Sequence, residues 1–318
     1  MRRNAQAVSH SKNRGSLYNG GPINHGVRTM VSLKRIFFIA PFLVVAHSAV
    51  SQDEAPIEVA DDVYSYGGPT GYVSMFVVTD DGVIAIDPIN TPHSQGLVAA
   101  IKSVTDQPIR YLVHSHNHWD HSGGGQVFRD EGTTIIAHVD AYEWMRTNPH
   151  PDMVVPDESW GGSRKDIVLG GTTVELHHFG MSHGRGMTVP LASAQRVAYI
   201  ADVVAPSRLP FMFLPDFNVR DLERTLGQIL MLDIDKVVFT HSANPDPLQG
   251  GTKQDVADTL QYLRDLRAGI DAEIANGTPS RLAPDAVRLP KYENWAMYDE
   301  WLALNAWKIW LEGHLGPF

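Results

Sequence analysis

The stretch "HSHNHWDH", at positions 114–121, places four histidines and one aspartate within eight residues. Imidazole and carboxylate groups are common ligands of divalent metal ions. In extended backbone, residues i and i+2 point the same way, so His116 and His118 are expected to converge on one ion. Asp120 and His121 diverge from that pair and can serve a second ion. The spacing differs from the helical HExxH arrangement, in which the two ligands are four residues apart.

Three more potential ligands follow along the chain: His183 in "GMSHGRG", Asp202 in "YIADVV" and His241 in "VVFTHSAN". Each lies at the end of a predicted strand or just beyond it, where side chains from different strands can meet at a sheet edge. The chain contains no cysteine, which removes thiolates from the candidate ligands and nucleophiles. We therefore predict two zinc ions, with iron or manganese as alternatives.

Hydrophobic periodicity predicts that both strands and helices position these ligands. Residues 72–87 are typical of two strands joined at the turn signal Asp80-Asp81-Gly82, and the apolar strand "IRYLVHS" runs directly into the histidine cluster. Residues 147–163 are rich in proline, aspartate and glycine, which predicts a long loop. Two helices, over 253–276 and 292–312, are expected to close the chain. Strand clusters followed by helices, twice over, predict sheets sandwiched between helices in one domain.

These residues resemble the metallo-β-lactamase fold superfamily over about residues 57–250. The pattern HxHxDH is met in full at 116–121, and the later His, Asp and His positions match in order and setting. Asp87, which ends "GVIAID", resembles the structural aspartate before the metal loop. The resemblance implies an α/β fold, a four-layer αβ/βα sandwich with the site between its two halves.

The resemblance also implies a ligand set with a bridging carboxylate, similar to the glyoxalase II and lactonase branches. In that set, one metal takes His116, His118 and His183, the other takes Asp120, His121 and His241, and Asp202 bridges the two. Two departures from the family pattern are Met181-Ser182-His183 in place of Gly-His-Thr and Ala201-Asp202 in place of Gly-Asp. The absence of cysteine excludes the β-lactamase subclasses that use a thiolate ligand.

The expected activity is hydrolysis by an exported dinuclear enzyme, in which a metal-bridging hydroxide attacks a small ester, lactone, thioester or amide. Asp120 is the candidate catalytic residue, because its carboxylate can orient the nucleophile and accept its proton. One alternative is a β-lactamase of the thiolate-free type. Another is a mononuclear iron sulfur dioxygenase, which resembles this pattern but uses only part of it.

Candidate substrate-binding residues lie beside the ligands. Trp119 stands between two of them and is expected at the rim of the pocket. The aromatic run Phe211, Phe213 and Phe217, near Arg208, predicts an apolar wall with a cationic group, although a loop packed on the core would have the same composition. Four other histidines are expected to have structural roles or to support the ligands; they are His114, His138, His177 and His178.

The N-terminal segments are expected to be removed or unstructured. From Met30 the sequence shows a basic pair, an apolar run and small residues, the pattern of a signal peptide over 30–51. The apolar run is shorter than the about 20 residues that a membrane span needs, which predicts no stable span after cleavage and a periplasmic or secreted protein. Residues 1–29 are interpreted as a disordered leader or an over-extended start. The remainder, 52–318, is predicted to be the catalytic domain with a C-terminal helical extension.

Net charge and composition limit the classes of molecule that the protein is expected to bind. Residues 1–51 hold seven of the 26 basic residues and none of the 36 acidic ones, which leaves 19 bases against 36 acids and a net charge of −17. Nucleic-acid binding is excluded, because neutralising phosphates requires a basic surface. The expected partner is a small-molecule substrate. The C-terminal stretch "ENWAMYDEWLALNAWKIWLEG" holds four of the seven tryptophans and predicts core packing or a homodimer contact.

Overall fold

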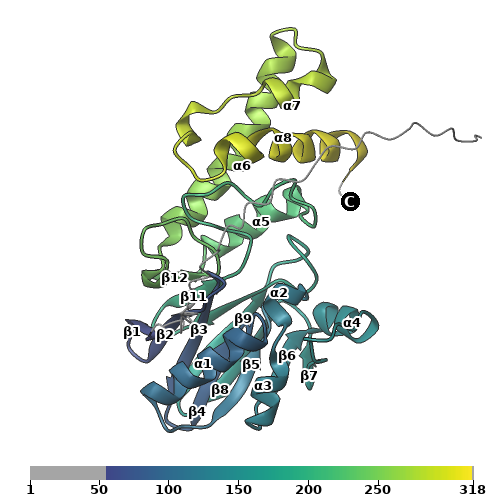
Figure 1. Ribbon diagram of the computed structural model, residues 1–318. Coiled ribbons are helices and arrows are strands. Elements are labelled where there is room, and N and C mark those ends of the chain that lie inside the picture. Colours follow the sequence, from purple (N-terminus) through teal and green to yellow (C-terminus); the bar gives the residue numbers. More distant parts are fainter. Residues whose placement is uncertain (1–54, 317–318) are drawn as a thin grey trace, which may run out of the picture. The chain divides into compact units, whose positions relative to one another are not determined.

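The computed structural model describes residues 55–316. The expected leader, 1–29, and signal peptide, 30–51, lie outside the described residues, so both stay predictions. Within residues 55–316, no helix is both long and apolar enough to cross a bilayer. This part of the chain forms two β-sheets that face each other, with helices on their outer faces (Figure 1).

The first sheet has seven strands whose spatial order follows the sequence. They are β1 (Ile57–Ala60), β2 (Val63–Gly67), β3 (Val73–Thr79), β4 (Gly82–Ile86), β5 (Ile109–Val113), β6 (Thr134–His138) and β7 (Glu158–Trp160). The strands β1 to β4 pair antiparallel, and Asp80-Asp81 forms the tight turn predicted between β3 and β4. The strands β4 to β7 pair parallel, since a helical crossover joins each one to the next.

The second sheet has five strands in the order β12-β11-β10-β9-β8. They are β8 (Arg164–Leu169), β9 (Thr172–His178), β10 (Thr188–Ala192), β11 (Val197–Ile200) and β12 (Lys236–Phe239). The two strands β11 and β12 are parallel to each other. Their carboxyl ends therefore lie at the same edge of the sheet, as metal ligands from both strands require.

Helices cover the outer face of each sheet, which completes the four layers. The helices are α1 (Thr91–Val104), α2 (Trp119–Ser122), α3 (Gly125–Asp130), α4 (Val139–Thr147), α5 (Val219–Ile229), α6 (Lys253–Ala275), α7 (Ala283–Ala286) and α8 (Tyr298–Leu315). Short 3-10 turns lie at Pro247–Gln249, Ser280–Leu282 and Pro290–Tyr292.

Alternation along the strands explains how the layers hold together. On β3, Met75 and Val77 point into the apolar core between the two sheets, whereas Phe76 points outward against α1 and α3. Helices α5 and α6 cover the outer face of the second sheet, where Leu226 and Leu263 join the largest apolar cluster. The predicted four-layer αβ/βα sandwich is confirmed.

Two local predictions were wrong. The expected loop 147–163 contains β7, a three-residue edge strand whose pairing with β6 has no local sequence signal. The helix expected from residue 292 begins only at Tyr298, because Pro290 opens a 3-10 turn and Met297 takes a left-handed conformation with φ of 65°.

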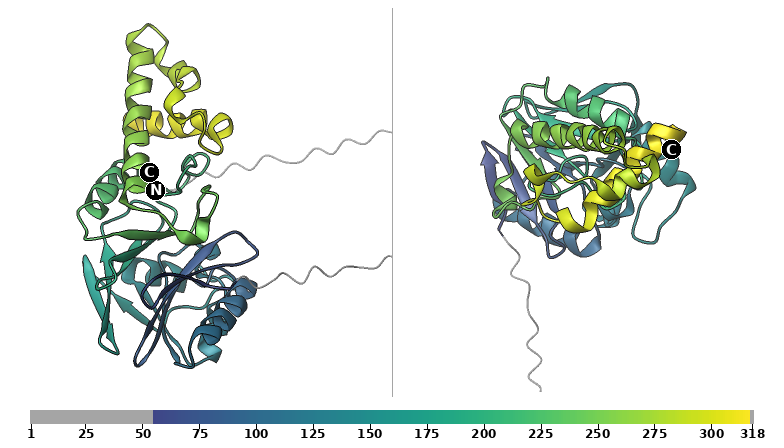
Figure 2. Two further views of the ribbon diagram at one scale, coloured as in Figure 1. Left: turned by 90° about the vertical axis from the view of Figure 1, so that its left-hand side faces the viewer. Right: turned by 90° about the horizontal axis from the view of Figure 1, so that it is seen from above.

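Helices α6, α7 and α8 pack on one another beyond the second sheet, and α8 crosses α6 (Figure 2). Trp295, Trp301 and Trp310 are partly buried against the core cluster that α6 shares with the sheet. Core packing therefore accounts for three of the four C-terminal tryptophans. The homodimer contact stays a prediction.

Candidate metal centre

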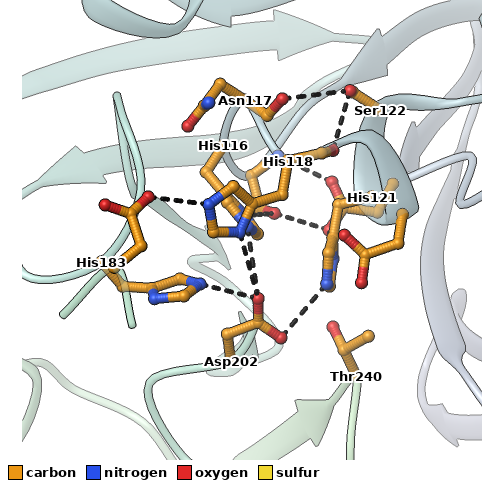
Figure 3. A network of polar contacts seen from close by, with 12 residues as sticks. His116, Asn117, His118, His121, Ser122, His183, Asp202 and Thr240 are labelled. Carbon is orange, nitrogen blue, oxygen red and sulfur yellow. Dashed lines mark hydrogen bonds and ion pairs between the residues drawn. The ribbon is translucent and has the colours of Figure 1, made fainter. Parts of the chain in front are cut away.

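Strand ends supply most of the predicted ligands. Strand β5 ends at Val113 and continues into the loop that carries His116 and His118, and His121 follows in α2. Asp202 lies two residues beyond β11, and His241 lies two residues beyond β12. Figure 3 shows the imidazoles of His116, His121 and His183 around the Asp202 carboxylate. The sequence segments thus meet at the edge between the two sheets.

The first set of ligand atoms surrounds one oxygen of Asp202. Asp202 Oδ2 lies 2.9 Å from His183 Nε2, 3.2 Å from His116 Nε2 and 4.0 Å from His118 Nδ1. In a tetrahedral zinc site with bonds of about 2.0–2.1 Å, the ligand atoms are roughly 3.3 Å apart. The first set therefore has the separations that a single divalent ion needs.

The second set surrounds the other oxygen of the same carboxylate. Asp202 Oδ1 lies 2.9 Å from His241 Nε2 and 3.1 Å from His121 Nε2. Each oxygen of Asp202 thus serves a different group of imidazoles. This is the arrangement of a carboxylate that bridges two ions.

Hydrogen bonds behind the ligands direct lone pairs into the centre. Ser115 Oγ donates to Asp87 Oδ2 over 2.6 Å, so it accepts from His116 Nδ1, 2.9 Å away. The same carboxylate accepts from His121 Nδ1 over 3.1 Å. With its Nδ1 atom protonated, the neutral imidazole of His116 carries its lone pair on Nε2. The Nε2 atom of His121, which faces Asp202 Oδ1 over 3.1 Å, holds a proton there that a bound ion would replace. Both Nε2 atoms are buried and make no well-directed hydrogen bond, as expected of metal ligands with hydrogen-bonded second nitrogens.

Electrostatics favours a cation at this point. Burial lowers the pKa of His116 and His183, which keeps these imidazoles neutral and available as ligands. Burial also acts on His121, but the nearby carboxylates of Asp202 and Asp87 outweigh it and raise the pKa of His121 well above its usual value. Burial would raise the pKa of Asp202, yet the charge on His121 and the surrounding imidazoles hold it well below its usual range. The donor set therefore fits divalent metal ions.

The structure places Asp120, the seventh predicted ligand, outside both sets. Its Oδ2 atom accepts a hydrogen bond of 2.8 Å from the hydroxyl of Tyr72, and the second set of ligand atoms within 4.8 Å of one another consists of His121, Asp202 and His241. Burial, reinforced by the Asp120 charge, raises the pKa of Tyr72, so Tyr72 keeps its proton and orients the carboxylate. The role of Asp120 as a ligand stays a prediction.

Two residues near the ligands carry contacts that their positions in the sequence do not reveal. Asp216 Oδ2 lies 2.8 Å from His118 Nε2, and this contact lowers the pKa of the Asp216 carboxyl. Tyr199 donates a hydrogen bond to Asp87 over 3.0 Å. Asp216 lies in the connection between β11 and α5, and nothing in its sequence neighbourhood distinguishes it from a solvated loop residue.

A cavity of about 890 Å³ opens onto the ligands. Its lining includes the predicted substrate residues Trp119, Arg208 and Phe211, whereas Phe213 is not part of it. Phe217, the third residue of the predicted aromatic run, also lines the cavity and packs against the His183 ring with centroids 4.0 Å apart. Further lining comes from Tyr72, Trp144 and Trp301, so six Phe, Trp and Tyr side chains contribute to the walls of this cavity.

Arg208 is the cation of this cavity. Its guanidinium lies 5.7 Å above the centre of the Trp301 ring, its Nε atom is buried without a hydrogen-bond partner, and burial lowers its pKa. A buried cation with an unsatisfied donor is costly unless another group neutralises it. Arg208 is thus suited to hold a negatively polarised oxygen of a bound molecule.

The four other histidines for which structural or supporting roles were predicted lie outside the two ligand sets. His114 is fully buried, which lowers its pKa to about 4 and keeps it neutral. His177 Nε2 contacts Glu175 over 2.8 Å. His138 and His178 stack on each other with ring centroids 3.9 Å apart and contribute nothing to the lining of the cavity.

Comparisons with known proteins agree with this geometry. Residues 67–241 match the family model of the metallo-beta-lactamase superfamily. The alpha subunit of 2,4-dinitroanisole O-demethylase from Nocardioides sp. (strain JS1661) is 29% identical over 198 residues, which cover 61% of this chain and 60% of that protein. The beta subunit is 23% identical over 251 residues, which cover 78% and 74%. The chain thus spans less than two thirds of the alpha subunit's length.

Solved structures share the fold at low identity. A metallo-beta-lactamase from Pontibacter korlensis has a TM-score of 0.58 at 18% identity, covering 66% of this chain and 98% of that one. The inverting sec-alkylsulfatase Pisa1 from Pseudomonas sp. has a TM-score of 0.64 at 14% identity, covering 83% and 50%. With its fold, its imidazole and carboxylate sets and its family match in agreement, this chain belongs to the metallo-beta-lactamase superfamily, which supports its prediction as a metal-dependent hydrolase.

Proposed function

We propose that this protein hydrolyses an ester, lactone, thioester or amide bond in a small, largely apolar substrate, with two divalent ions held on either side of Asp202. The observation that carries the proposal is the Asp202 carboxylate, whose two oxygens each face a separate set of imidazoles. Bound ions would supply a water of lowered pKa, near 7 for zinc, and would polarise the attacked oxygen.

The residues around the cavity would bind the substrate, stabilise the charge that develops on it and accept a proton. The aromatic rings of Trp119, Phe211 and Trp301 would bury the apolar body of the substrate and exclude water from it. Arg208 would hold the substrate oxygen on which negative charge develops, with charge-assisted hydrogen bonds. Asp120, oriented by Tyr72, would accept the proton released by the attacking water.

Asp120→Asn is expected to lower kcat by about 100-fold, because general-base catalysis contributes about 10²–10⁴, while the metal content stays within error of wild type. Tyr72→Phe, which keeps the carboxylate and removes only the 2.8 Å hydrogen bond that orients it, is expected to have a smaller effect. Steady-state kinetics with parallel elemental analysis tests both. Full activity in Asp120→Asn at full metal occupancy would remove this role from Asp120.

Arg208→Gln is expected to raise KM by about 10–100-fold for substrates with a carboxylate or carbonyl group within its reach, since a hydrogen bond to a charged group contributes about 1.5–3 kcal/mol. Arg185→Gln provides the control, because Arg185 lies near the ligands in the sequence but does not line the cavity. An unchanged KM in Arg208→Gln, measured for several substrates, would show that Arg208 does not contact them.

A second candidate is the removal of an alkyl group from the oxygen of an activated aryl ether. Two relatives are named as subunits of 2,4-dinitroanisole O-demethylase, and the aromatic walls of the cavity suit a flat ring. A panel of lactones, thioesters, phosphoesters, β-lactams and 2,4-dinitroanisole, assayed on one preparation, separates these activities. If the protein bound one iron per chain and consumed oxygen when a persulfide was the substrate, these results would support the dioxygenase alternative and contradict hydrolysis.

A further inference from the structure

Helix α8 buries three polar side chains to which the proposed hydrolysis assigns no role. Asn305 is fully buried, Lys308 is 1% exposed and Glu312 is 9% exposed. They lie at positions i, i+3 and i+7, so they share one face of the helix. Lys308 Nζ pairs with Glu312 Oε1 over 3.3 Å. Because a buried polar group is costly without a hydrogen bond, the other two side chains are informative through their partners.

The partners of Asn305 include the connection between β11 and α5. We call residues 205–218 of this connection the cavity loop, because five of them line the cavity. Asn305 Nδ2 donates to the Pro210 carbonyl over 3.1 Å and also to the Met212 carbonyl. The Asn305 amide therefore holds the two carbonyls on either side of Phe211, and Phe211 lines the cavity.

Helix α6 holds Asn305 from the opposite side. The Tyr262 hydroxyl donates to Asn305 Oδ1 over 2.9 Å. The two carbonyls of the cavity loop can only accept, so the amide nitrogen must face them and the oxygen must face Tyr262. Both ends of the Asn305 side chain are thus hydrogen-bonded, and an apolar residue of similar size would leave three buried groups without a partner.

The C-terminal part of the chain also fixes the start and the end of the cavity loop. Near the start, the Leu209 N–H donates to the Ala296 carbonyl over 3.1 Å, and the Ala296 N–H donates to the Ser207 carbonyl over 2.8 Å. At the end, both carboxylate oxygens of Glu312 accept from the Val219 N–H, over 3.2 and 3.1 Å. Val219 is the first residue of α5, where a negative charge is favourable.

The same contacts bring one wall of the cavity together. The Phe211 and Trp301 rings meet edge to face with centroids 5.4 Å apart, and the Arg208 guanidinium lies above the Trp301 ring. All three side chains line the cavity. Two of them belong to the cavity loop and one belongs to α8, so the width of the cavity at this wall depends on how α8 holds the loop.

We propose that Asn305 is a positioning residue that sets the substrate specificity of this cavity. By holding the Pro210 and Met212 carbonyls, it keeps the cavity loop where Arg208 and Phe211 can contact a substrate with a bulky aryl group. The positioning of the loop follows from the contacts above, whereas the role in specificity rests on the proposed hydrolysis. Loss of the amide would weaken the binding of large substrates more than that of small ones and would remove no metal ligand.

Hydrogen exchange followed by mass spectrometry tests the positioning without a substrate. The proteins are wild type, Asn305→Leu, Tyr262→Phe and Thr259→Val. Thr259→Val is the matched control, because it also removes a buried hydrogen bond from α6, but one that ends on the Asp255 carbonyl of the same helix. In Asn305→Leu we expect the backbone amides of the cavity loop to exchange at least about tenfold faster, with β11 and β12 unchanged. In Thr259→Val we expect the cavity loop to exchange as in wild type.

Steady-state kinetics on the same proteins tests the specificity. Two substrates of the hydrolysed class are compared that differ only in carrying a naphthyl or a methyl group. In Asn305→Leu we expect the KM of the naphthyl substrate to rise about tenfold and that of the methyl substrate less than about twofold, since a loosened wall costs binding only where the substrate touches it. The metal content is expected to match wild type. Tyr262→Phe, which loses only the hydrogen bond behind Asn305, is expected to shift both readouts in the same direction by a smaller factor, and it decides the test if Asn305→Leu does not fold.

Equal exchange of the cavity loop in Asn305→Leu and Thr259→Val would overturn the proposal. Faster exchange throughout the two sheets would also overturn it, because that result would show a general loss of stability. An unchanged KM for the naphthyl substrate, together with faster exchange of the loop, would exclude the role in specificity. If wild type hydrolysed no substrate but the loop exchanged as expected, only the proposed function would be contradicted.

Discussion

Asp202→Ala is expected to abolish detectable hydrolysis, by a factor of at least about 10³, and to lower the number of ions bound at the catalytic centre. The carboxylate supplies one oxygen to each set of imidazoles. Without it, the second set retains only His121 and His241, and two imidazoles hold zinc far more weakly than a complete ligand set. The first set retains three histidines and is expected to keep an ion at reduced affinity.

Asp216→Asn is the control for this substitution. Asp216 contacts His118 at Nε2, whereas His118 Nδ1 is the nitrogen that faces Asp202. The loss of the Asp216 carboxylate is therefore expected to lower metal affinity or activity by about 10–100-fold without emptying a site. The measurements are elemental analysis after equilibrium dialysis and initial rates on the same samples. If Asp202→Ala kept two ions at the centre and near wild-type activity, a bridging role for Asp202 would be excluded.

Asp87→Asn is expected to destabilise the fold by about 3–5 kcal/mol, the range found when one partner of a buried charged network is removed. Asp87 is fully buried and accepts from the Ser115 backbone N–H and hydroxyl over 2.7 and 2.6 Å, and from Tyr199 over 3.0 Å. An asparagine side chain can replace only part of this network. Its amide nitrogen is a hydrogen-bond donor, so it cannot accept the hydrogen bonds that one oxygen of the Asp87 carboxylate accepts. Asparagine is the right substitution, since it tolerates the left-handed φ of 55° at this position.

Urea unfolding of chelator-treated protein measures this loss independently of bound metal. Asp166→Asn is the matched control, because Asp166 is an exposed ion-pair partner and such pairs contribute about 0–1 kcal/mol. We also expect weaker metal binding in Asp87→Asn, because His121 loses its carboxylate acceptor and the Ser115 hydroxyl that accepts from His116 loses the carboxylate that orients it. Equal stability of Asp87→Asn and Asp166→Asn would show that the network is dispensable.

The sequence was most informative where ligands follow strands. His116, His118, His121, His183, Asp202 and His241 were all proposed from residue type and position, and the structure brings the six together. These ligands could be predicted because the residues that follow a strand lie at the sheet edge where that strand ends. Residue type and predicted secondary structure therefore indicate the same position for the metal centre. The four-layer arrangement was predictable for the same reason.

Contacts between distant loops could not be predicted. Asp120 and its partner Tyr72 are 48 residues apart, and Asp216 lies 98 residues from His118. Trp301 reaches the cavity from α8, although the sequence assigned that tryptophan-rich segment to packing or dimerisation. His138 and His178 come from different sheets, so only the packing of those sheets brings their rings together.

The most direct test of the account is the amount of metal that restores activity. Wild-type protein stripped by a chelator and dialysed is titrated with zinc, and hydrolysis of a responsive substrate is followed. The account predicts that activity is lost on stripping and returns as two zinc ions bind per chain. Full hydrolytic activity in the stripped protein, or full recovery at one ion per chain, would contradict it.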